Sequence, residues 1–194
     1  MTAETIDREL VLRLQEGDLD SLGDLYDRHR HLVYRTALAI SGDPEMASDL
    51  LQEVFLRLNR FADHIDPERP LEPWLYRMTA NLSYTWLKKR NRWLRLVRDI
   101  TDRFVVDKRP SPHALAERDE TWQWVRQAIM SLPIQQRLVV VLYYINDLSI
   151  QEVSEVLEIP AGTIKSRLYY ARKQLKKKLG VHEEALLKVF YEAG

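Results

Sequence analysis

Cysteine is absent from this sequence of 194 residues. Without thiols the chain can form neither disulfide bonds nor a thiolate zinc site, and the absence fits a reducing, intracellular compartment. The histidines are scattered along the chain: His29, His31, His64, His113 and His182. We therefore predict no metal-binding residues and no cofactor.

Long apolar runs are absent as well. The longest, Leu138 to Ile145, is far shorter than the roughly 20 residues of a membrane-spanning helix. The first ten residues are acidic and lack the apolar segment of an export signal. We therefore predict a cytoplasmic protein that makes no membrane contact.

Glycine is scarce, with 6 residues in the whole chain, and no segment alternates between apolar and polar residues. Apolar residues recur instead at spacings of three and four, which is the period of helices. A content of 45% hydrophobic and 30% charged residues suits compact domains with cores of their own. The sequence predicts an all-α fold of two helical domains joined by a flexible linker, with almost no strand.

Turn signals divide the chain further. The helical pattern breaks near Gly17 and again over residues 41–44, where Asp43 is a predicted N-cap and Pro44 a first helical residue. Residues 97–112 show weak periodicity and end in Pro-Ser-Pro, which is typical of a linker. The predicted units are a first domain, a linker, a second domain and a C-terminal tail, spanning residues 1–95, 96–113, 114–180 and 181–194.

Charge is distributed unevenly although the formal net charge is zero. Acidic residues dominate the first thirty positions, and two later clusters are basic. The first cluster contains Lys88, Lys89, Arg90, Arg92, Arg95 and Arg98, and the second contains Lys165, Arg167, Arg172, Lys173, Lys176, Lys177 and Lys178. Two separate surfaces that face a polyanion are therefore expected.

A helix-turn-helix is the sharpest local signal. Residues 149–152 (SIQE) form a predicted capping box, in which Ser149 and Glu152 bond to each other's backbone amides. The pattern is interrupted at residues 158–160, and a second helix is predicted from about Ala161, with one apolar and one basic face. A helix of this kind fits the major groove of DNA and contacts bases with its early turns.

Three segments of the sequence resemble bacterial sigma factors, and most closely the extracytoplasmic-function (ECF) group. Residues 131–179, with LSIQEV at 148–153 and GTIKSRL at 162–168, resemble region 4. The segments DLLQEVFLRL at 49–58 and PWLYRMTANL at 73–82 resemble regions 2.2 and 2.3 to 2.4. The resemblance extends over about residues 10–179, with the segments in the family's order and spacing.

Two positions depart from the family pattern. Glu158 stands where the family usually has a turn glycine, and Pro160 where a capping serine is common. A left-handed backbone at Glu158 would cost about 1 kcal/mol. Proline is tolerated at a helix start because that amide is unpaired in any case.

The resemblance implies a non-enzymatic sigma factor that binds core RNA polymerase, recognises the minus-10 and minus-35 promoter elements and promotes DNA melting. The implied partners are promoter DNA, an anti-sigma factor, and the clamp helices of the largest polymerase subunit together with the flap region. No catalytic residue is predicted.

The predicted site residues form three groups. Phosphate and base contacts at the minus-35 element are assigned to Lys165, Ser166, Arg167, Tyr169, Tyr170, Arg172, Lys173, Lys176 and Lys177. Minus-10 recognition and melting are assigned to Arg77, Asn81, Tyr84, Lys88, Lys89 and Arg90, with residues 64–72 completing a pocket for unstacked bases. Polymerase binding is assigned to Asp49, Gln52, Glu53, Leu56 and Arg57. The tryptophans Trp74, Trp86 and Trp93 are predicted to be core residues.

Three other classes of protein share parts of this pattern. A helix-turn-helix regulator that is not a sigma factor would need a sensing domain with strands, and residues 1–95 lack alternation. A nucleic-acid enzyme would need clustered carboxylates, a phosphate loop or an activated nucleophile, and no such motif occurs. A helical adaptor that binds only proteins would not retain duplex DNA through residues 113–194.

Overall fold

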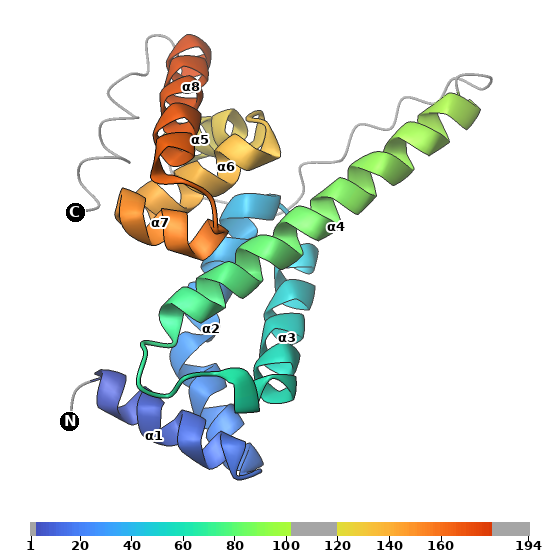
Figure 1. The fold of residues 1–194 in the computed structure, drawn as a ribbon. Coiled ribbons are helices and arrows are strands. Elements are labelled where there is room, and N and C mark those ends of the chain that lie inside the picture. Colours follow the sequence, from blue (N-terminus) through green and yellow to red (C-terminus); the bar gives the residue numbers. More distant parts are fainter. Residues whose placement is uncertain (1–2, 102–119, 180–194) are drawn as a thin grey trace.

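The computed structural model describes residues 3–101 and 120–179, which are helical with short connections and contain no strand. The elements are α1 (Ala3–Gln15), α2 (Leu19–Ser41), α3 (Pro44–Arg60), the 3-10 turn η1 (Ala62–His64), α4 (Glu72–Thr101), α5 (Glu120–Met130), α6 (Ile134–Val140), the π-helical turn η2 (Val141–Ile145), α7 (Ile150–Leu157) and α8 (Ala161–Leu179). The all-α prediction is confirmed, and the two groups of helices are visible in Figure 1. No helix within the described ranges combines the length and hydropathy that crossing a membrane requires.

Local sequence accounts for the boundaries of the first helices. Gly17 adopts φ +89° between α1 and α2, a conformation that glycine reaches without steric cost. Gly42 ends α2 with φ +69°, and its amide bonds to the carbonyl of Leu38. The Asp43 carboxylate then accepts from the first amides of α3, and Pro44 is a first helical residue, as predicted.

Helices α1 to α4 enclose one hydrophobic core between them. Its buried residues come from all four helices and from the α3–α4 connection: Leu10, Val11, Leu14, Leu25, Val33, Val54, Phe55, Leu58, Ala62, Ile65, Leu71 and Leu75. Tyr26 meets Phe55 edge to face, with 5.0 Å between the ring centroids. Trp74 is half-buried against this core, as expected.

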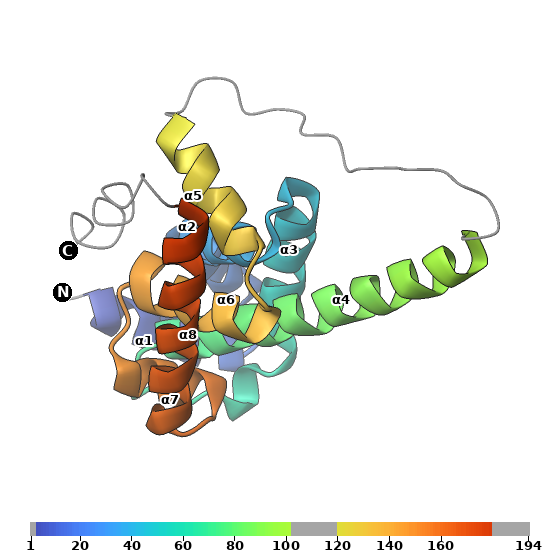
Figure 2. The same cartoon turned by 90° about the horizontal axis from the view of Figure 1, so that it is seen from above.

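Helix α4 is longer than the sequence suggests. It continues to Thr101, beyond the predicted end of the first domain, and its last turns extend past the other helices in Figures 1 and 2. The prediction that Trp86 and Trp93 are core residues is wrong, because 37% and 61% of their surfaces are exposed. Leu87, next to Trp86 on α4, is by contrast buried in the core.

Several predictions fall on parts of the chain outside the description. They are the linker beyond residue 101, the start of the second domain from residue 114, the tail from residue 181, and the side chains of Arg95 and Arg98. Helix α6 continues directly into η2. At the end of η2, the Asn146 amide bonds to the Val141 carbonyl at 3.0 Å, which is the wide π-type turn.

The two groups of helices pack against each other, which the sequence does not predict. One buried cluster combines Ala37, Ile40 and Tyr76 of the first group with residues of α5 to α8. At its centre the Asn146 amide nitrogen donates to the Thr36 hydroxyl at 2.8 Å. Burial there raises the pKa of the Tyr76 hydroxyl.

Arginines bridge the same contact. Arg137 on α6 donates to the Ile40 carbonyl at 2.9 Å and also to the carbonyls of Met130 and Leu132. Burial lowers the pKa of its guanidinium. Arg126 donates to the Gly42 carbonyl at 2.5 Å, so the turn that ends α2 is held by both arginine-bearing helices, α5 and α6.

Candidate nucleic-acid interface

Helices α7 and α8 form the predicted helix-turn-helix. The capping box is confirmed: the Glu152 amide donates to the Ser149 hydroxyl at 3.2 Å, and the Ser149 amide donates to the Glu152 carboxylate at 2.7 Å. These bonds hold the pKa of Glu152 below its usual range. Glu158 has φ +54° and ψ +41°, so it adopts the left-handed backbone at the turn where the family usually has glycine.

Replacing Ser149 with alanine should lower the free energy of unfolding of the C-terminal helices by about 1 kcal/mol, because the first turn of α7 loses its side-chain acceptor. Thermal unfolding followed by circular dichroism measures the change. The control is Ser48→Ala, which alters an exposed serine inside α3 and should leave the melting temperature nearly unchanged. Equal melting temperatures for the wild type and Ser149→Ala would show that the cap contributes nothing.

Helix α8 has a buried and an exposed face. The buried stripe consists of Ile164, Leu168, Ala171, Leu175 and Leu179. The opposite face is exposed and carries Lys165, Ser166, Tyr169, Tyr170, Lys173, Lys176 and Lys177. The rings of Tyr169 and Tyr170 lie edge to face with centroids 5.4 Å apart. This cationic and aromatic surface suits a polyanion whose bases offer hydrogen bonds and stacking.

Two predicted residues border the buried stripe instead. Arg172 donates to the Tyr144 hydroxyl at 2.6 Å, and its guanidinium lies 5.6 Å from the centre of that ring. Arg167 donates to Gln135 at 3.3 Å. Both arginines therefore also tie α8 to the preceding helices.

A second polar face lies on α4, where Arg77, Asn81, Tyr84 and Lys88 recur at helical spacing. Asn81 and Lys88 are exposed, whereas Tyr84 is half-buried against the shared core. The Lys88 ammonium lies 5.9 Å from the centre of the Tyr84 ring. The structure thus brings these four predicted residues together on one side of the helix.

The other two predicted residues of α4 lie off this face. Lys89 is exposed. Arg90 pairs with the Asp43 carboxylate at 3.2 Å and lies over the exposed Trp86 ring, with 5.4 Å from its guanidinium carbon to the ring centre. An exposed tryptophan beside a cation is a surface feature that the sequence prediction missed, because Trp86 fits the apolar spacing of the helix.

Arg77 is engaged by the helix-turn-helix in this arrangement. Its guanidinium pairs with Glu158 at 2.9 Å and donates to the Glu155 carbonyl at 3.0 Å, both at the end of α7. The ion pair is solvent-exposed at both ends, with 41% and 67% of the side chains accessible, so it contributes little to stability. Arg77 can therefore exchange this partner for another anion at small cost.

Residues 61–71 connect α3 to α4 and include most of the predicted pocket loop. Ile65 and Leu71 anchor the loop in the core, while Asp63, His64 and Arg69 are exposed. The loop leads directly into the first turn of α4, two turns before Asn81 and one turn before Arg77. The exposed groups of the loop are therefore close in sequence to the polar face of α4.

The predicted polymerase-binding residues share the exposed side of α3. Asp49, Gln52 and Leu56 are exposed, and Glu53 pairs with Arg57 at 2.7 Å. Leu56 is the apolar residue of this surface, with 62% of its area accessible. The structure thus brings these five predicted residues together on one side of α3.

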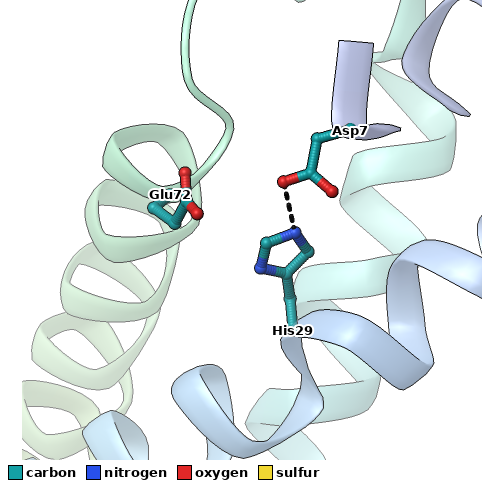
Figure 3. A group of neighbouring side chains, drawn as sticks. All are labelled: Asp7, His29 and Glu72. Carbon is teal, nitrogen blue, oxygen red and sulfur yellow. Dashed lines mark hydrogen bonds and ion pairs between the residues drawn. The ribbon is translucent and has the colours of Figure 1, made fainter. Parts of the chain in front are cut away.

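One group of residues in the described part of the chain has the composition of a metal site. Asp7, His29 and Glu72 each place one possible ligand atom within 4.8 Å of the others (Figure 3). The buried Asp7 carboxylate already accepts from Arg28 at 2.7 Å and lies 2.9 Å from the His29 ring nitrogen. Because both of its oxygens have partners, the group functions first as a link between α1 and α2.

A capped helix-turn-helix with a cationic second helix, beside a second helical unit with its own polar and aromatic face, defines a two-domain DNA-binding protein. The family models "Sigma-70 region 2" and "Sigma-70, region 4" match residues 25–93 and 122–175, which is more than half of the chain. The chain belongs to the sigma-70 family of RNA polymerase sigma factors, in the extracytoplasmic-function group.

Individual relatives agree with this assignment. The ECF RNA polymerase sigma factor SigW of Bacillus subtilis is 29% identical over 91% of this chain and 98% of its own. The ECF sigma factor SigE of Mycolicibacterium smegmatis is 33% identical over 86% of this chain and 65% of its own. The fold is similar to that of the sigma factor RpoE from Bartonella quintana in complex with the anti-sigma factor NepR. That comparison has a TM-score of 0.64 and 22% identity, and covers 81% of this chain and 98% of the other.

Proposed function

We propose that the exposed face of α8 reads the minus-35 promoter element, that the polar face of α4 and the 61–71 loop hold the opened minus-10 element, and that α3 docks on the clamp helices of core RNA polymerase. The observation that carries the proposal is the cationic and aromatic face of α8, opposite a fully buried stripe. Such a face fits a helix that enters the major groove.

The proposal divides α8 by role. Lys165, Ser166, Tyr169 and Tyr170 approach base edges from its early turns, while Lys176 and Lys177 contact phosphates further along. Lys173 lies between the two sets. Arg167 and Arg172 add phosphate contacts while keeping α8 against the rest of its domain, in line with their bonds to Gln135 and Tyr144.

We also propose the functional division of the chain and its setting. Residues 1–95 form the polymerase-binding and minus-10 domain, residues 114–180 the minus-35 domain, residues 96–113 the linker and residues 181–194 a tail. The chain acts in the cytoplasm as a non-enzymatic factor and leaves the chemistry of RNA synthesis to the polymerase. An anti-sigma factor is a further proposed partner, since the Bartonella quintana sigma factor has one.

The minus-10 assignment is tested by exchanging Arg77 for alanine. Because Arg77 would contact DNA phosphates next to the unstacked bases, the variant should form open promoter complexes about tenfold less efficiently. Permanganate reactivity of the promoter thymines, with holoenzyme assembled from core polymerase, measures the effect.

The matched control is Glu158→Gln, which removes the ion pair to Arg77 but leaves the α4 face intact. This variant should open promoters at least as well as the wild type, because it leaves Arg77 bound to α7 only through the Glu155 carbonyl. If Arg77→Ala and Glu158→Gln reduce melting equally, the ion pair itself matters and the assignment of Arg77 to DNA is wrong.

A further inference from the structure

Helix α1 runs along the 61–71 loop and contacts it through polar side chains in order. Gln15, at the end of α1, reaches the start of the loop, and Arg8, two turns earlier on the same side, reaches its middle. Asp7 lies close to Glu72, where the loop enters α4 (Figure 3). Helix α1 therefore lies along the 61–71 loop from its start to its end.

Gln15 makes the most specific of these contacts. Its side-chain amide nitrogen donates to the carbonyls of Ala62 and Ile65, both at 2.9 Å. These carbonyls lie on either side of the exposed His64, and the Ile65 amide also bonds to the Ala62 carbonyl at 2.9 Å. A single amide group thus fixes the backbone of the η1 turn at two points.

Arg8 fixes the middle of the loop. Its guanidinium bonds to the Glu68 carboxylate at 2.8 Å, and this partner holds the pKa of Glu68 below its usual range. Both side chains are largely exposed, so the pair orients the loop without stabilising the fold appreciably. Asp66 adds a local bond, since its carboxylate accepts from the Glu68 amide at 3.0 Å.

The position of α1 is itself fixed from the other side. The buried Asp7 carboxylate is bound by Arg28 and His29 of α2, as Figure 3 shows for the histidine. Because a loop carries fewer backbone hydrogen bonds than a helix, side-chain anchors from a rigid neighbour decide its conformation. The α1 helix can serve as that rigid neighbour.

We infer that Gln15 and Arg8 are positioning residues for promoter melting: from α1 they hold the 61–71 loop in the shape that receives an unstacked minus-10 base. The inference rests on the proposed role of this loop. Holding single-stranded bases requires hydrogen-bond donors and acceptors at fixed positions. If the loop had to become ordered each time it bound a base, this ordering would cost free energy and weaken binding. Neither residue touches DNA in this account.

The test uses Gln15→Met in the full-length chain, which keeps the length of the side chain and removes both donated bonds. With core polymerase, this variant should form open complexes about tenfold less efficiently and lose most of its base preference at the minus-10 element, measured across a promoter library. Its affinity for core polymerase and its preference at the minus-35 element should stay within twofold of the wild type. Arg8→Ala should show the same pattern at about threefold.

The control Glu16→Gln changes the exposed neighbour of Gln15 and should behave as the wild type. On a template with a preformed bubble, Gln15→Met should recover most of its activity yet retain the relaxed base preference. Unchanged minus-10 preference in both Gln15→Met and Arg8→Ala would overturn the inference, as would parallel losses of polymerase affinity. If the wild type itself opens no promoter, the proposed function is wrong. If the wild type opens promoters and the variants keep its minus-10 preference, only the inference about Gln15 and Arg8 is wrong.

Discussion

Replacing Leu56 with aspartate should weaken binding of the chain to core RNA polymerase about thirtyfold, a loss of about 2 kcal/mol that is typical of an apolar anchor in an interface. Leu56 is 62% exposed on α3, so the change leaves no cavity and should not alter the free energy of unfolding. The carboxylate would instead be buried against the polymerase without a partner. Affinity is measured by fluorescence titration of the labelled chain with core polymerase.

The matched control for this variant is Leu19→Asp. Leu19 is 64% exposed at the start of α2, outside the group of predicted polymerase-binding residues, and its replacement exchanges an exposed leucine for the same charged residue. Leu19→Asp should bind polymerase as the wild type does. Equal affinities for Leu56→Asp and the wild type would remove α3 as the polymerase-binding surface.

Lys165→Ala and Lys176→Ala should weaken binding at the minus-35 element in different ways. Loss of Lys165, on the first turns of α8, should reduce discrimination between the correct and a mismatched element by about 1 to 3 kcal/mol. Loss of Lys176 should weaken binding to all sequences and lower the slope of log affinity against log salt by about 1. Competition binding of the holoenzyme at several salt concentrations measures both quantities.

The control on the same helix is Gln174→Ala, an exposed uncharged residue whose loss should change neither quantity. The division between base and phosphate contacts depends on the two lysines behaving differently. If both variants lose affinity equally on matched and mismatched DNA, α8 attracts DNA by charge alone and does not read the element.

Local sequence signals predicted the parts of this structure that depend on neighbouring residues. The capping box at Ser149 and the N-cap at Asp43 each involve residues within a few positions of one another. The exposed face of α8 followed from helical period alone, since its apolar residues recur at three and four. The capping box and the exposed face of α8 make up most of the proposed minus-35 site.

Contacts between distant residues could not be predicted in the same way. The bond from Asn146 to Thr36 and the engagement of Arg77 by Glu158 depend on how the two helical units pack, which no local pattern encodes. Trp86 was assigned to a core because its spacing fits the apolar stripe of α4, yet only its neighbour Leu87 is buried there, and 37% of Trp86 is exposed. Gln15 gave no signal, because an isolated glutamine near a helix end is common on surfaces.

The most direct test of the central claim is run-off transcription on genomic fragments of the host, with purified core polymerase in the presence and absence of this chain. The account predicts new start sites that depend on the chain, each preceded by common minus-10 and minus-35 elements at a fixed spacing. Transcripts that begin at the same positions with and without the chain, under conditions in which the chain binds core polymerase, would contradict it.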